Sequence, residues 1–113
     1  MSARLTSALL VSALARRVAN EGGNAVVVAK GDATAGSILL ICFNKGIRTA
    51  FRERLLGVEG GYDWAAVGPA PDANYEVVDA WLSRRRARDP DLWIVELDIP
   101  NAERFAAETS GDG

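Results

Sequence analysis

The side chains best suited to binding an anion gather in one arginine-rich segment of this 113-residue chain. Arg84 and Arg88 stand four residues apart, so a helix would bring them together as a doubled cation. Guanidinium groups suit bidentate pairing with phosphate or carboxylate. The segment also fits a plainer interpretation, in which the arginines complement the negative end of a helix and pair with nearby acids. The candidate partner-binding residues here are Arg84, Arg85, Arg88, Asp89 and Asp91.

A second segment, Lys30-Gly31-Asp32, looks at first like a loop that cradles phosphate. A phosphate loop has Gly-x-x-x-x-Gly-Lys-Ser/Thr spacing and opens a helix, and this segment does neither. Gly and Asp are also the residues that a turn between strands requires. We therefore predict a turn, and keep Lys30 and Asp32 as secondary candidates for contact with a ligand.

Residue types exclude several catalytic chemistries. The chain has no histidine, which rules out Ser-His-Asp and Cys-His mechanisms and imidazole metal ligands. Cys42 is the one cysteine and lies in an apolar run, which predicts a buried side chain rather than a nucleophile. Asp89-Pro90-Asp91, even with Asp63 or Glu59 brought near by folding, lacks the ordered acidic spacing of a calcium loop. The sequence therefore predicts no catalytic residue, no metal ligand and no cofactor.

The overall charge argues against a general attraction to nucleic acid or to an anionic membrane. Thirteen Lys and Arg against fifteen Asp and Glu give a formal net charge of −2. The apolar stretch 5–15 runs directly into Arg16-Arg17 and so lacks the order of an export signal. No other stretch approaches the ~18 apolar residues of a membrane span. A single cysteine forms no internal disulfide, which favours a reducing compartment. From these absences together we expect a cytoplasmic protein with no membrane partner.

Hydrophobic periodicity and turn residues divide the chain into helices and strands. Helical spacing predicts helices at about 5–20 and 74–88, the second capped by Asp72 or Asn74 and ended by Pro90. Apolar or alternating runs predict strands at 25–29, 37–43, 47–56, 62–67 and 92–97, with a turn over 57–61. The first two runs are almost wholly apolar, which predicts a hairpin of inner strands with a long connection. Tyr62 and Trp64 would form a base-stacking platform if their strand is exposed.

The predicted fold class is α+β, an antiparallel four- to five-stranded sheet with two packed helices in the order α-β-β-β-β-α-β. Both helices are expected on the apolar face of a meander. Residues 1–97 form a single α+β domain in this prediction. Residues 98–113 form a polar C-terminal tail, with a short helical turn around 102–108 and a disordered tip.

Two motifs are similar to those of a known family. They are Lys30-Gly31-Asp32-x-x-Ala35-Gly36, before an Ile-Leu-Leu run, and Arg84-Arg85-Arg86-x-Arg88-Asp89-Pro90-Asp91-Leu92-Trp93, before a Val-Glu strand. With Ala13-x-x-Arg16-Arg17 at the end of the first helix, they resemble small alphaproteobacterial proteins of unknown-function family 1491. The resemblance covers residues 4–97 and implies a conserved bacterial protein whose role is unassigned, so it implies no activity.

Three function classes remain open, and we favour the first. It is a non-catalytic protein-interaction or adaptor domain, with an unknown protein partner or a homo-oligomer formed through an exposed edge of the sheet. The alternative is an accessory that binds nucleic acid or a phosphate ligand through the arginine-rich helix end, which the net charge disfavours. The second alternative is a histidine-independent or metal-assisted enzyme relying on carboxylates, Lys, Tyr or a bound metal.

Overall fold

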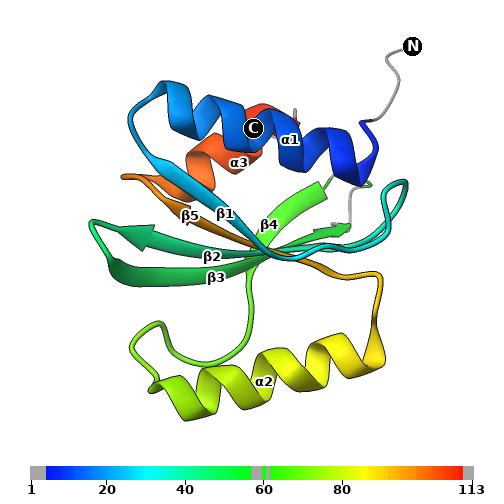
Figure 1. Cartoon of the computed structure of the whole chain (residues 1–113), viewed down its shortest axis with the longest axis vertical. Helices are drawn as coiled ribbons and strands as arrows, with labels where there is room; N and C mark the ends of the chain where they lie inside the picture. Colours follow the sequence, from blue (N-terminus) through cyan, green and yellow to red (C-terminus); the bar gives the residue numbers. More distant parts are fainter. Residues whose placement is uncertain (1–4, 57–59, 61, 111–113) are drawn as a thin grey trace.

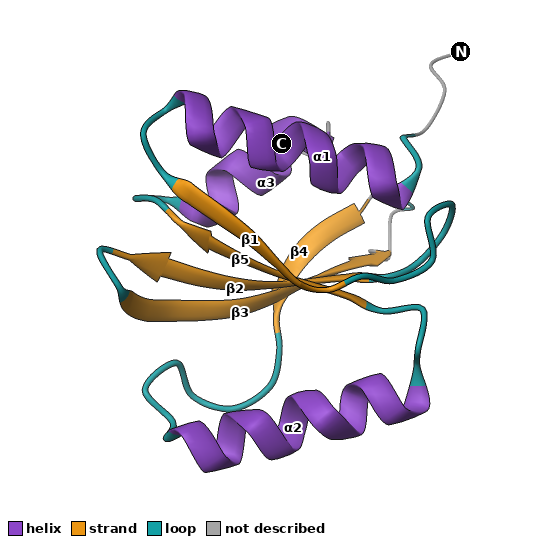
Figure 2. Cartoon of the chain, viewed as in Figure 1, coloured by secondary structure: helices purple, strands orange, loops and turns teal. Residues whose placement is uncertain are grey.

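A mixed five-stranded sheet lies between two layers of helix in the computed structural model, which describes residues 5–56, 60 and 62–110 (Figure 1; Figure 2). The helices are α1 (Ser7–Asn20), α2 (Tyr75–Arg88) and α3 (Ala102–Ser110). The strands are β1 (Asn24–Ala29), β2 (Ile38–Asn44), β3 (Ile47–Leu56), β4 (Tyr62–Ala66) and β5 (Trp93–Asp98). The predicted α+β class and the order of its first seven elements are confirmed.

The sheet order is β1-β5-β2-β3-β4, which corrects the predicted meander. β5 lies between β1 and β2, antiparallel to β1 and parallel to β2, whereas β3 is antiparallel to both of its neighbours. The predicted hairpin between 25–29 and 37–43 is therefore wrong, and the sheet is mixed rather than purely antiparallel. The physical reason is that β5, whose residues 93–95 are buried, suits the centre of the sheet better than β1 does.

The helices cover both faces of the sheet, and the expectation that they share one face is wrong. α1 and α3 lie on one side of the sheet, and α2 lies alone on the other (Figure 1). Alternate residues of β2 belong to two separate cores: Leu40 packs below α1 and α3, while Leu39 and Ile41 pack towards α2. A strand that is apolar on both faces needs cover on both.

α3 carries the core past residue 97, where we predicted a polar tail to begin. Ala102 and Ala106 are buried in the core below α1. Arg17 of α1 donates to Glu108 Oε1 at 2.7 Å and lies 5.4 Å from the centroid of the Phe105 ring. The predicted helical turn around 102–108 lies within α3, but the sequence did not show that it packs in the core, because two alanines form most of its buried side. The predicted disordered tip at 111–113, and most of the predicted turn at 57–61 with Glu59, lie outside the described residues.

The N-terminal apolar stretch forms a core helix. Thr6 caps α1 by accepting from Leu9 N at 3.3 Å, and Leu10, Leu14 and Val18 of α1 are buried. None of the helices in the described part of the chain has the length and apolar character that crossing a bilayer demands. The cytoplasmic location stays a prediction.

α2 is attached to the sheet by a few long side chains. Asn74 caps its start by accepting from Val77 N at 3.0 Å, and α2 ends at Arg88, before Pro90. Trp81 meets Phe51 edge to face, with ring centroids 5.1 Å apart. The guanidinium of Arg85 donates to both carboxylate oxygens of Glu53, at 2.7 and 3.0 Å. The residues of α2 that contact the sheet side of the molecule are Val78, Trp81, Leu82 and Arg85.

Of these four α2 residues, Arg85 is the one that makes a polar contact with the sheet, through its ion pair with Glu53. Glu53 is only 8% exposed, so its carboxylate depends on the guanidinium for neutralisation. The hydrogen bonds that Arg85 donates to Glu53 raise the pKa of Arg85 above its ordinary value, although partial burial opposes this. The pair connects α2 to β3.

We predict that Arg85→Ala lowers the free energy of unfolding by about 2 kcal/mol, because it leaves a buried carboxylate unpaired. Arg84→Ala, one residue away but exposed, is expected to change it by less than about 0.5 kcal/mol. Urea unfolding of the two variants measures both values. A double Glu53→Leu and Arg85→Leu variant recovers most of the loss if the unpaired charge is its cause. Equal stabilities for the Arg84 and Arg85 variants would contradict this account.

Candidate functional site

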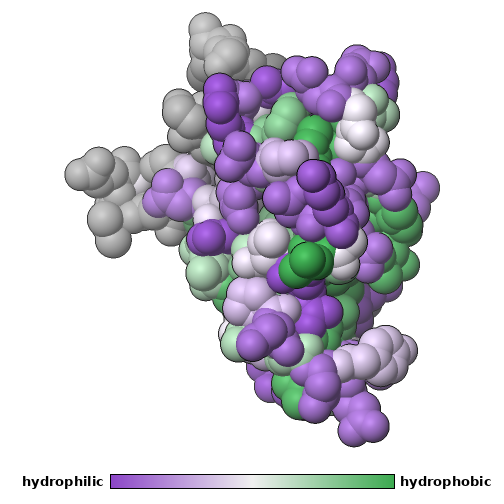
Figure 3. Space-filling model, turned by 90° about the vertical axis from the view of Figure 1, so that its left-hand side faces the viewer, coloured by the Kyte–Doolittle hydropathy of each residue, from purple (hydrophilic) through white to green (hydrophobic). Residues whose placement is uncertain are grey.

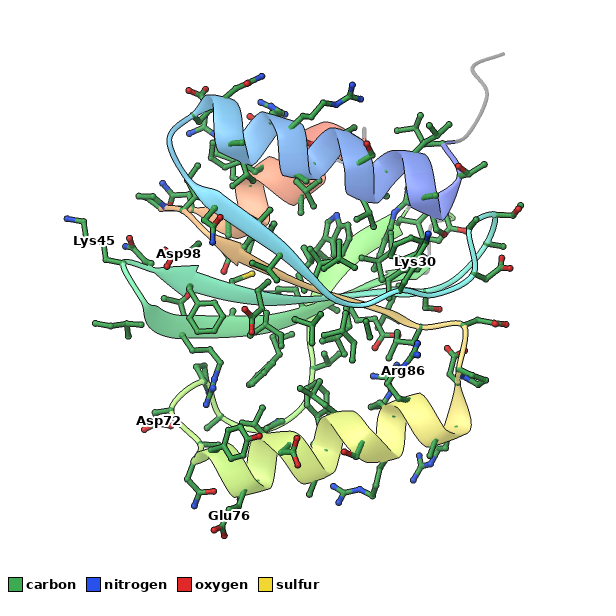
Figure 4. All side chains as sticks on the ribbon, in the orientation of Figure 1. Lys30, Lys45, Asp72, Glu76, Arg86 and Asp98 are labelled. Atoms are coloured by element: carbon green, nitrogen blue, oxygen red, sulfur yellow. The ribbon has the colours of Figure 1, made fainter. Side chains whose placement is uncertain are left out.

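The two segments singled out in the sequence lie against each other at one end of the sheet. Asp32 N donates to the Asp91 carbonyl at 3.0 Å, and the Trp93 indole Nε1 donates to the Asp32 carbonyl at 2.7 Å. Arg86 reaches from α2 towards both segments (Figure 4). Its Nη1 lies within hydrogen-bonding distance of three carbonyl oxygens, those of Lys30 (3.5 Å), Pro90 (2.9 Å) and Leu92 (2.5 Å). We call residues 30–36 and 89–93 together the loop junction.

The carboxylates of Asp32 and Asp89 are engaged within their own turns. Asp32 Oδ2 accepts from Thr34 N at 3.2 Å and from Ala35 N at 2.8 Å. Asp89 Oδ1 accepts from Asp91 N at 3.1 Å. Such bonds close Asx turns, which is what the turn interpretation of Lys30-Gly31-Asp32 requires. The side chains of Lys30 and Asp91 are exposed.

Two glycines let the halves of the loop junction approach closely. A Cβ added at Gly31 would lie 2.0 Å from the Asp91 carbonyl oxygen, and one added at Gly36 would lie 2.3 Å from the same atom. No side chain fits at either distance. The inner side of the 30–36 turn is therefore filled by protein backbone, where a phosphate loop would hold its ligand.

The start of α1 completes the loop junction. Ser7 N and Ala8 N donate to the carbonyls of Thr34 and Ala33, at 3.1 and 2.9 Å. Ser7 Oγ donates to the Gly36 carbonyl at 2.6 Å. The first amides of a helix attract anions when they are free, but here backbone carbonyls and the Thr6 cap accept them. Three segments therefore meet at this end of the sheet. The first amides of α1 already have acceptors, so this helix start offers no anion site.

The arginine cluster divides into two inward and two outward side chains. Arg85 pairs with Glu53, and Arg86 binds carbonyls of the loop junction. Arg84 and Arg88 are exposed, and neither forms an ion pair with another described residue. The candidate anion-binding pair is thus Arg84 and Arg88. Sequence reasoning missed the role of Arg86, because only the folded position of α2 distinguishes it from its neighbours.

A cavity of about 410 Å³ opens between the start of α1, the 34–38 segment and the β3–β4 pair. Arg54 on its wall lies over the Tyr62 ring, 4.3 Å from the centroid. Trp64 packs against the core, and its Nε1 donates to Ser110 Oγ at 3.3 Å. The two rings expected as a stacking platform are therefore already engaged by protein side chains.

Cys42 is fully buried between the sheet and the layer of α1 and α3. Burial, and then the charge on Glu103, raises the pKa of its thiol to about 12. A thiol in this state is neutral and unreactive near neutral pH, so the predicted core role is confirmed. Across residues 5–56, 60 and 62–110, no three Asp, Glu or Cys side chains are grouped as a metal site would require.

β1 forms an exposed edge, which the sequence placed wrongly as an inner strand. It pairs with β5 on one side, and no described strand pairs with its other side. Val26, Val27 and Val28 are 44%, 45% and 51% exposed. Figure 3 shows apolar colour along one margin of the molecule at the height of the sheet, with further apolar patches near the centre and the top of a mainly polar face. β1 is therefore the candidate interaction surface with the clearest apolar character.

The fold and its surface define a small α+β sandwich with an open strand edge. The chain belongs to the family described as protein of unknown function DUF1491, whose model matches residues 5–107. That match includes the first turns of α3, in agreement with the buried Ala102 and Ala106. No curated protein matches the chain.

Solved structures of similar proteins share this fold. A crystal structure of a DUF1491 family protein from Caulobacter crescentus has 28% identity and a TM-score of 0.76, over 89% of this chain and 94% of that one. The NMR structure of a DUF1491 family protein from Caulobacter crescentus has 28% identity and a TM-score of 0.73, over 92% of this chain and 94% of that one. The solution structure of protein Atu0922 from A. tumefaciens has 30% identity and a TM-score of 0.67, over 88% of this chain and 89% of that one. The alphaproteobacterial resemblance seen in the two motifs is confirmed.

We predict that Gly31→Ala lowers the free energy of unfolding by about 2 kcal/mol, because the added methyl group overlaps the Asp91 carbonyl and forces the loop junction apart. Lys30→Ala, an adjacent and exposed position, serves as the control and is expected to change it by less than about 0.5 kcal/mol. Denaturant unfolding measures both. A Gly31→Ala protein as stable as the wild type would show that the two motifs do not depend on each other.

Proposed function

We propose that this protein is a non-catalytic interaction domain that binds its partner by adding a strand to the open edge of β1. The observation that carries the proposal is the run of three valines, each between 44% and 51% exposed, on a strand with one unpaired side. Unpaired backbone groups give such an edge its affinity for an extended segment, and alternate side chains supply specificity.

The two edges of the sheet differ in how they are protected. Proteins usually guard an edge with charged side chains, proline, a bulge or a short strand. β4 is five residues long and carries the exposed Asp63. β1 has neither charge nor proline between Asn24 and Ala29, and its one protective feature is a bulge between Val27 and Ala29. The contrast supports β1, rather than β4, as the binding edge.

The side chains with the chemistry for other activities make contacts within the fold. Asp32 and Asp89 close turns, Arg85 and Arg86 fasten α2 and the loop junction, and the Cys42 thiol is buried. Groups held in this way are poorly placed to exchange protons or to bind substrate. This favours an interaction domain over a histidine-independent enzyme.

The test places a photo-crosslinking amino acid at Val28 and, in a matched control, at Val77 in an alphaproteobacterial host. Val77 lies on α2 and is 48% exposed, close to the 51% of Val28, so both probes sample the surroundings equally. We expect a defined covalent adduct from Val28 and none from Val77. Mass spectrometry of the adduct identifies the partner segment. The absence of a specific adduct at Val28 would overturn the proposal.

A second candidate function rests on the exposed pair Arg84 and Arg88, which stand one helical turn apart on α2. Two guanidinium groups at this spacing suit two phosphate or carboxylate groups. The pair would make the protein a nucleic-acid or phosphate-binding accessory. The net charge of −2 argues against attraction over the whole surface, so binding would be local.

Fluorescence anisotropy with a labelled oligonucleotide tests this second function. We expect the double variant Arg84→Glu, Arg88→Glu to weaken binding strongly and to remove about two units from the slope of log affinity against log salt. The control changes two other exposed cations, Arg16 and Lys45, to Glu, which alters the net charge equally. If the wild type does not bind, or if both double variants lose binding equally, the pair is excluded as a specific site.

A further inference from the structure

We infer that the strand added to β1 is the β1 strand of a second copy, which pairs antiparallel about a two-fold axis and joins the two sheets into one. This inference rests on the proposed function and names its partner. Two adjoining surfaces carry it, the edge of β1 and one side of α1. The side chains on both surfaces are apolar or small, and none of them is charged.

The first surface, the β1 edge, is complementary to itself. An antiparallel pair centred on Val27 sets Val27 against its own copy and brings Val26 to Val28 of the second copy. Half-exposed valines would thus be covered by valines, and β-branched side chains pack well across strands. No charged side chain lies between Asn24 and Ala29, so no like charges meet. A two-fold interface requires this kind of self-matching patch.

The second surface is the side of α1 that lies away from α3. At 100° per residue, Leu10, Leu14 and Val18 point to the sheet, while Arg17 points to α3, where it contacts Phe105 and Glu108. Because α1 packs against both β1 and β5, the opposite side of the helix faces out past the edge of β1. Figure 1 shows α1 in front of α3, above β1. The residues on this side are Ala8, Ser12, Ala15 and Ala19.

Small side chains on this side allow close approach of a second helix. When β1 meets its copy, the same two-fold axis brings α1 of each copy alongside the other in antiparallel orientation. Alanine and serine let two helix backbones come near, and none of the four positions carries charge. Arg16, which is exposed, lies towards the outer surface of the helix by the same helical geometry.

The extent of the combined surface matters, because a strand edge alone is a small interface. A stable dimer usually buries about 800 Å² on each partner. The edge of β1 and the side of α1 contribute two adjoining layers of the sandwich, so the contact is two layers deep. β4, which is short and bears Asp63, offers no comparable combination.

Sedimentation equilibrium of the full chain provides the test. We expect a dimer for the wild type, and a dissociation constant weakened more than about tenfold for Val26→Lys with Val28→Lys, and separately for Ser12→Glu. Val77→Lys, which adds a lysine at an equally exposed valine on α2, should leave the dimer intact. Circular dichroism confirms that each variant folds, since all four positions are exposed.

Orientation is tested by a single cysteine at the centre of the proposed pair. Val27→Cys should form a disulfide between copies under mild oxidation, because the two-fold axis sets residue 27 opposite itself. Val77→Cys should not, and the buried Cys42 does not compete. A wild-type monomer at high concentration, or a dimer insensitive to both the strand and the helix variants, would overturn the inference. If the Val28 crosslink instead captures another protein, the proposed function stands and the second copy is excluded.

Discussion

The position of β5 between β1 and β2 is the constraint on which the rest of this structure depends. β5 is buried along most of its length and is parallel to β2, with α2 as the crossover that returns the chain to the sheet. Because β5 is apolar on both faces, it must lie inside the sheet with helices on either side. Its insertion separates β1 from β2 and so leaves β1 at the edge. The open edge is a direct consequence, and our proposed interaction rests on it.

The same insertion creates the loop junction. The segment that leads into β5 passes beside the connection between β1 and β2, and Asp32, Asp91 and Arg86 join the two by hydrogen bonds to backbone. Gly31 and Gly36 are the residues that make this contact sterically feasible. The two motifs that identify the family therefore belong to one structural feature. Asp32, Asp91 and Arg86 connect the two motifs by hydrogen bonds, so the motifs have a structural role within the fold.

The sequence predicted the local elements well and the long-range pairing poorly. Helical spacing and the cap at Asn74 placed α2, and the apolar run around Cys42 placed a buried strand. The sheet order escaped prediction because the apolar run 25–29 is equally compatible with an inner strand and with an edge that binds a partner. The helical turn around 102–108 was predicted, but its place in the core was not, because its buried side is made of alanines. The candidate residues were located correctly as segments, but the split between Arg84 and Arg88 outside and Arg85 and Arg86 inside depends on how α2 docks.

The central claim is that β1 is an edge only in the isolated chain and an inner strand in the working assembly. Amide hydrogen exchange measures this directly, because β1 amides that do not bond to β5 exchange rapidly unless a second strand covers them. The account predicts that these amides are protected in the wild type at high concentration and unprotected in the Val26→Lys, Val28→Lys variant, while the amides of β5 stay protected in both. Equal and rapid exchange of the outer β1 amides in both proteins would contradict it.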